Sequence, residues 1–204
     1  MLECKAVAIF LFLPYSLVMM DVSIAYGKGR LTFQLDSGLN LQLVEPTHEA
    51  GLPDQKAAVL DALRNPIGRP PLREFVSVGD RVGIVFSDIT RATPYDVMLP
   101  PLIEEIGSVA GTEIVLFNAT GTHRQNTNAE LEGILGPGIV GRFRIVQNDC
   151  TDSSTHRVVG TTPGGNQVSL LSEFLDCEVK VLTGFIEPHF FAGFSGGGKA
   201  IMPG

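Results

Sequence analysis

Short apolar runs alternate with segments of helical spacing through most of the chain, and this alternation constrains the fold more than any other feature. The apolar runs predict strands over 81–86, 113–117, 143–146 and 178–182, and a weaker strand over 167–171. The spacing of apolar residues predicts helices over 54–64, 94–109 and 127–135. Thr127 and Glu130 have the spacing of a capping box. Apolar strands separated by helices are typical of a mainly parallel sheet that is covered on both faces, so we predict a Rossmann-like α/β fold.

A β-hairpin is predicted ahead of this sheet. Residues 22–26 and 31–35 alternate between apolar and polar side chains, with a glycine-rich turn between them. The apolar run over 6–20 is too short to span a membrane, and it reads either as a secretory leader or as a start assigned too early. Cleavage after the small residues that follow the run would destroy the first strand. We therefore prefer a true start at Met19 or Met20.

The charge and cysteine content exclude several classes of protein. The formal net charge is −7, whereas a general nucleic-acid binder needs a concentrated basic face. The three cysteines form no C-x-x-C pair, so neither a disulfide framework nor a thiolate zinc site is expected. Glycine accounts for 23 of the 204 residues, and much of this excess lies in loops beside polar residues. These loops are where function is to be sought.

Polar or glycine-rich loops follow three of the predicted strands directly. The first loop carries Asp88 and Arg91, the second carries His123, and the third carries His189 and Lys199. In open α/β sheets, ligands bind outside the carboxyl ends of the strands. If the three strands are parallel neighbours, all these side chains face one crevice. Each also has a structural alternative, since an aspartate at this point can cap a helix and an arginine can be solvated.

The chemistry of the two loop histidines suits proton transfer. Imidazole titrates at about pH 6.5, so two facing histidines can remove and return a proton on opposite faces of a prochiral carbon. An arginine beside them supplies a planar fork for a carboxylate. We predict that His123 and His189 are functional, and that His48 and His156, in less structured stretches, are not.

The glycine run before Lys199 matches a phosphate-binding loop only in part. Residues 193–199 fit G-x-x-x-x-G-K, but Ala200 stands where a serine or threonine must hold magnesium. A nucleoside triphosphatase or other phosphoryl-transfer enzyme is therefore disfavoured. Backbone N–H groups could still cradle a phosphate at the start of a helix near Lys199, and the donors would be those of Gly196, Gly197 and Gly198. A flexible turn with a solvated lysine is the alternative.

Three motifs in this order resemble the nickel-dependent lactate racemase family. They are D-x-T-R at 88–91, G-T-H-R at 121–124, and GFIEPHFFAGFSGGGKAIMPG at 184–204. The resemblance runs from about residue 21 to the end and covers the N-terminal domain of that family. It implies a racemase or epimerase of 2-hydroxy acids that works by hydride transfer. It also implies a nickel pincer nucleotide, a nicotinate-derived mononucleotide, tethered to Lys199 through a thioamide.

The same resemblance implies roles for individual residues. His123 and His189 would be the acid/base pair, and Arg91 would contact the substrate carboxylate. The cofactor side would be formed by Lys199, Asp88, Thr90, Gly196, Gly197 and Gly198. No residue of this chain is assigned as a metal ligand. The expected partners are a small 2-hydroxy-acid substrate and cofactor-biosynthesis proteins, in the cytoplasm, with neither nucleic acid nor membrane.

The family's members are about twice as long as this chain and carry a second domain. In those members, the histidine that ligates nickel lies shortly after the last motif, at a position that would fall beyond Gly204. We therefore expect residues 1–20 to be a leader from a mis-called start and residues 21–204 to be an N-terminal catalytic and cofactor-binding domain that is truncated at its C-terminus. Such a fragment is expected to have little or no activity alone. The alternative is a non-catalytic nucleotide- or phosphate-binding module.

Overall fold

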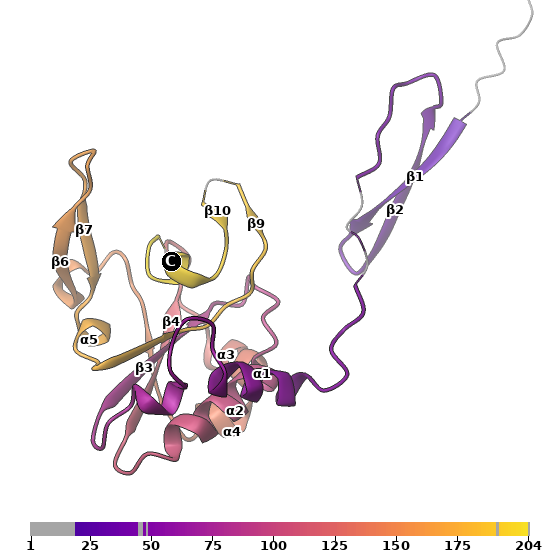
Figure 1. Ribbon diagram of the computed structural model, residues 1–204. Coiled ribbons are helices and arrows are strands. Elements are labelled where there is room, and N and C mark those ends of the chain that lie inside the picture. Colours follow the sequence, from indigo (N-terminus) through magenta and orange to yellow (C-terminus); the bar gives the residue numbers. More distant parts are fainter. Residues whose placement is uncertain (1–18, 45–46, 48, 191, 204) are drawn as a thin grey trace, which may run out of the picture. The chain divides into compact units, whose positions relative to one another are not determined.

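The computed structural model describes residues 19–44, 47, 49–190 and 192–203 (Figure 1). The chain divides into two units, Met1–Ala50 and Gly51–Gly204, and each is described by itself. Most of the expected leader and His48 lie outside the described residues.

The first unit contains the predicted hairpin. Strand β1 (Met19–Tyr26) pairs antiparallel with β2 (Gly29–Asp36). A two-residue turn joins them, and its first residue, Gly27, has a φ of 57°, which a side chain would disfavour. The hairpin is thus confirmed, and β1 begins at Met19, three residues earlier than the alternation suggested.

The second unit is built on a four-stranded parallel sheet. Its strand order is β5 (Arg144–Gln147), β4 (Glu113–Ala119), β3 (Arg81–Ser87) and β8 (Val179–Leu182). All four strands lie within two residues of the predicted ranges. The α/β class with a parallel sheet is therefore confirmed.

Among the described residues, four helices cover one face of the sheet, which we call the first face. These are α1 (Gln55–Arg64), α2 (Tyr95–Gly107), α3 (Asn128–Leu135) and the short α4 (Pro137–Val140). The main core lies between them and the sheet. Its buried residues include Ile84, Phe86, Tyr95, Leu99, Ile106, Leu116 and Leu131.

The second face carries a smaller core. Val85, Val115 and Phe117 of the sheet pack there against Phe174 of the one-turn helix α5 (Ser172–Leu175). Ala200, which ends the 3₁₀ helix η3 (Gly197–Ala200), packs against the same cluster. Within the described residues, the helices on this face are thus single turns, whereas those on the first face are longer.

For the segment between β5 and β8, one expectation is confirmed and another is wrong. The weak strand over 167–171 does form, as β7 (Gln167–Leu171), but it pairs antiparallel with β6 (His156–Thr161) outside the main sheet. His156 therefore opens a strand and does not lie in a less structured stretch. Strand β6 gave no clear sequence signal because its side chains are mostly exposed and a bulge interrupts its register near Val158.

The predicted capping box at the start of α3 is confirmed. Thr127 Oγ1 accepts the Glu130 N–H at 3.3 Å, and Glu130 Oε2 accepts the Thr127 N–H at 2.8 Å. Arg124 donates to both carboxylate oxygens of Glu130, at 2.8 and 2.7 Å. This hydrogen bonding, first from Arg124 and then from the Thr127 backbone, lowers the pKa of Glu130 to about 2. The box thereby ties the loop that carries His123 to the start of the helix.

We expect the contribution of Glu130 to stability to depend on pH. Because its pKa is lower in the folded chain, the carboxylate stabilises the fold above its usual pKa of 4.5, and this stabilisation is lost as the pH falls toward about 2. Glu130→Gln should lower the midpoint of urea unfolding at pH 6. The difference in midpoint between the variant and the wild type should become smaller as the pH is lowered from 4.5 to 2. The control is Glu132→Gln, an exposed carboxylate on the same helix. A difference that stays constant with pH would contradict the argument.

Candidate active site

The order of the strands brings the three polar loops to one edge of the sheet. Strand β3 lies between β4 and β8, and all three run parallel. The loops that follow them meet around a cavity of about 230 Å³. Seven of the nine candidate residues line it, namely Asp88, Thr90, Arg91, His123, His189, Gly196 and Lys199. Gly197 and Gly198 belong to the adjacent turn and do not line the cavity.

The end of β3 is held by the first residue of α2. The hydroxyl of Tyr95 accepts the Ser87 N–H at 2.6 Å. Tyr95 is 1% exposed and packs edge-on against Phe86, with ring centroids 6.0 Å apart. The core thus positions the backbone from which Asp88 projects.

Asp88 is buried and links two of the loops. Its Oδ1 accepts the Thr90 hydroxyl at 2.6 Å and the Thr90 N–H at 3.2 Å, while its Oδ2 lies 2.6 Å from His123 Nδ1. An ionised carboxylate only accepts hydrogen bonds, so this contact places a proton on Nδ1. The Nε2 atom of neutral His123 is then a proton acceptor, on a side chain that is about half exposed (54%).

The second histidine is held in the opposite tautomer. His189 lies in β9 (Pro188–His189), which pairs with β10 (Gly193–Phe194). Its Nδ1 accepts the Ala192 N–H at 3.3 Å, so the neutral ring carries its proton on Nε2. Both rings line the cavity, and their neutral forms carry the proton on different nitrogens.

Arg91 is paired with a residue to which the sequence assigned no role. Its Nη1 donates to Glu187 Oε1 at 2.8 Å, and both side chains are partly exposed. The pair joins the loop after β3 to the loop after β8. The sequence feature that could have pointed to Glu187 is its position directly before Pro188 and His189 in the last motif.

Lys199 lies at the end of a closely packed glycine loop. A Cβ on Gly184 would lie 3.1 Å from Gly196 Cα, and one on Gly196 would lie 3.2 Å from Ile186 Cγ1. The two ends of this loop therefore need glycine in order to approach each other, which argues against a merely flexible turn. The helix expected near Lys199 is the four-residue η3, which begins two residues earlier. Across the described residues, the Lys199 amine forms no hydrogen bond or ion pair.

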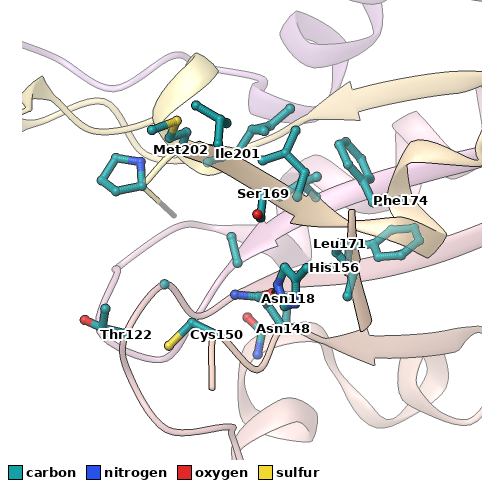
Figure 2. Close-up of a pocket in the computed structure, with 18 of the residues that line it drawn as sticks. Asn118, Thr122, Asn148, Cys150, His156, Ser169, Leu171, Phe174, Ile201 and Met202 are labelled. Carbon is teal, nitrogen blue, oxygen red and sulfur yellow. Dashed lines mark hydrogen bonds between the residues drawn. The ribbon is translucent and has the colours of Figure 1, made fainter. Parts of the chain in front are cut away.

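A larger cavity of about 610 Å³ adjoins this site, between the second face of the sheet and the β6–β7 hairpin (Figure 2). Its apolar wall includes Phe117 and Phe174, and its polar wall includes Cys150 and His156. No Lys, Arg, Asp or Glu is among its described lining residues, so it offers neither a lysine nor an arginine to pair with a carboxylate or phosphate. Both ring nitrogens of His156 are already paired, with Asp152 O and Asn148 Oδ1, each at 2.9 Å. The reactive groups thus gather in the smaller cavity.

Nowhere in the described ranges do three or more His, Cys, Asp or Glu side chains cluster as a metal site. Within those ranges no helix is both long and apolar enough to cross a membrane. Cys150 and Cys177 are free thiols.

Comparison with known proteins identifies the family of this chain. A family model described as the lactate racemase N-terminal domain matches residues 26–204. This chain belongs to that family. The lactate racemase of Thermoanaerobacterium thermosaccharolyticum is 34% identical over an alignment of 190 residues, and the match covers 91% of this chain and 44% of that relative. The lactate racemase of Lactiplantibacillus plantarum is also 34% identical over 190 residues, covering 91% of this chain and 45% of that protein.

Solved structures place the fold in the same family. The structure of the lactate racemase apoprotein from T. thermosaccharolyticum superposes with a TM-score of 0.76 at 32% identity, over 91% of this chain and 43% of that one. A Thermotoga maritima protein of 21% identity, with a TM-score of 0.56 over 74% of this chain and 37% of that one, shares the fold. The lactate racemase N-terminal domain of this chain thus spans less than half the length of the curated relatives it matches.

Proposed function

We propose that this chain is the catalytic N-terminal part of a racemase or epimerase of lactate-like 2-hydroxy acids. One observation carries the proposal. Three neighbouring parallel strands bring His123, Arg91, His189 and Lys199 to a single cavity. The similarity to lactate racemases supports the same substrate class.

Each side chain then has a defined task. Arg91 holds the substrate carboxylate with the N–H groups that Glu187 leaves available. His123 Nε2 accepts the hydroxyl proton of one enantiomer and becomes an imidazolium, while His189, starting as the imidazolium, returns a proton to the product and is left neutral; for the other enantiomer the two roles exchange. The buried carboxylate of Asp88 stabilises the imidazolium that forms on His123.

The residues present fit the nickel pincer nucleotide that the family resemblance implies. Lys199 offers an amine on the cavity wall without a partner in the described part of the chain, as a covalent tether requires. A Cβ on Gly197 or Gly198 would meet no atom within 4 Å, so a phosphate would have room beside this stretch of backbone. When bound, the group supplies a reversible acceptor for the substrate's α-hydride. The cofactor-biosynthesis proteins and the cytoplasmic location stay predictions.

Asp88 and Thr90 take a different role in this proposal from the cofactor contact that the resemblance implied. Both oxygens of the Asp88 carboxylate are engaged inside the protein, by Thr90 and by His123. We therefore assign this pair to orienting His123.

A chimera tests the proposed function. Residues 19–204 of this chain would replace the matching part of the T. thermosaccharolyticum lactate racemase, in cells that make the cofactor. We expect the chimera to racemise both lactate enantiomers, and His123→Asn or His189→Asn to abolish turnover in both directions. His156→Gln, in the larger cavity, is the control and should stay active. A folded chimera that carries the cofactor but gives no turnover would overturn the proposal, while full turnover by the chain alone would contradict the expectation that it is a fragment.

Removal of the Asp88 charge should misorient His123. In the chimera, Asp88→Asn is expected to lower kcat by about 10²-fold, because the amide no longer selects the Nδ1-protonated tautomer. In the isolated chain, long-range ¹⁵N spectra should show His123 losing that tautomer. Asp149→Asn is the matched control, since Asp149 makes the same contacts to Thr151, at 3.0 and 2.6 Å, without touching His123. An unchanged His123 spectrum in Asp88→Asn would refute this role.

A further inference from the structure

Glu187 places a negative charge directly beside the residue that we assign to bind the substrate's negative charge. The Glu187 carboxylate lies 2.8 Å from Arg91 Nη1. The side chains are 36% and 25% exposed, so the pair is partly shielded from solvent. Arg91 has no other side-chain hydrogen bond within the described residues. A guanidinium has five N–H donors, so an edge formed by Nε and Nη2 stays available for a second carboxylate.

Hydrogen bonds within its own loop fix the backbone of Glu187. Ser195 is 6% exposed and bonds to both sides of the Glu187 backbone. Its N–H donates to Glu187 O at 2.9 Å, and its Oγ accepts the Glu187 N–H at 3.0 Å. The same hydroxyl donates to Phe185 O at 2.5 Å. A carboxylate on so well anchored a backbone can hold the Arg91 side chain in one orientation.

We propose that Glu187 positions Arg91 and, through its charge, sets the affinity of the site for carboxylates. This inference rests on the proposed function, because it takes Arg91 as the group that binds the substrate carboxylate. With Glu187 on one side of the guanidinium and the substrate on the other, two anions share one cation. Their repulsion weakens substrate binding, and it does so without loss of the orientation that Glu187 provides.

The experiment separates charge from position. Lactate is titrated into the isolated chain and its binding is followed at the Arg91 Nε–Hε signal in ¹H–¹⁵N spectra. Glu187→Gln keeps an oxygen that can accept from Nη1 but removes the charge, and we expect it to tighten lactate binding by roughly three- to tenfold. Glu187→Asp keeps the charge and should give no such gain. Asp176→Asn removes one negative charge from an arginine pair away from the cavity, at 2.7 Å from Arg157, and should leave the affinity unchanged.

Arg91→Gln distinguishes the failure of this inference from the failure of the proposed function. Loss of lactate binding in Arg91→Gln, together with a gain in Glu187→Gln, supports both. Loss in Arg91→Gln without a gain in Glu187→Gln, or an equal gain in Glu187→Asp, overturns the role of Glu187 alone. If Arg91→Gln still binds lactate, the assignment of Arg91 is overturned, and the inference about Glu187 with it. The same conclusion follows if neither the wild type nor Glu187→Gln binds lactate.

Discussion

Replacement of Lys199 by alanine should abolish covalent attachment of the cofactor. Produced in cells that make the nickel pincer nucleotide, the wild-type chain is expected to show a stable increase in intact mass, located by peptide mapping to the segment that contains Lys199. Lys199→Ala should show none. The reason is that the Lys199 side chain lines the small cavity, on a glycine loop that is closely packed at Gly184 and Gly196.

Lys28→Ala is the matched control for the Lys199→Ala prediction. Lys28→Ala removes an exposed lysine from the turn of the hairpin and should leave the mass increase unchanged. An adduct that persists in Lys199→Ala would refute the assignment of the tether. A wild-type chain without any adduct, under conditions where the T. thermosaccharolyticum lactate racemase acquires one, would favour the non-catalytic phosphate-binding alternative.

Phe86→Ala should destabilise the second unit by about 3–5 kcal/mol, the usual cost of removing a fully buried phenylalanine. Phe86 is 0% exposed and packs edge-on against Tyr95, with an angle of 87° between the ring planes. Urea unfolding followed by circular dichroism measures the loss. Because Tyr95 also holds Ser87, the same substitution should weaken the contact between Asp88 and His123, visible as a changed His123 spectrum below the unfolding midpoint.

The control for this prediction is Phe190→Ala. Phe190 carries the same side chain but is fully exposed, at 105% of its reference area, so its removal should change stability by less than about 0.5 kcal/mol. Equal effects of the two substitutions would show that Phe86 is not part of the core.

Local sequence patterns were sufficient for much of the fold. Apolar periodicity located the four strands of the parallel sheet, and the Thr127–Glu130 spacing located the start of α3. These signals are local because a strand or a capping box is decided by residues within a few positions of one another. They located β7 but missed β6, whose side chains are mostly exposed and whose register is interrupted by a bulge.

The sequence by itself determined which residue types are available at the ends of the strands, and its motifs indicated the family. Only the tertiary structure decided how those residues are paired. His123 meets Asp88 across 35 positions, and Arg91 meets Glu187 across 96. Such pairs depend on β3 lying between β4 and β8, which no local pattern specifies, because the order of strands is settled by how the helices and loops pack over the whole sheet. That order turns separate polar loops into one site with opposed histidine tautomers.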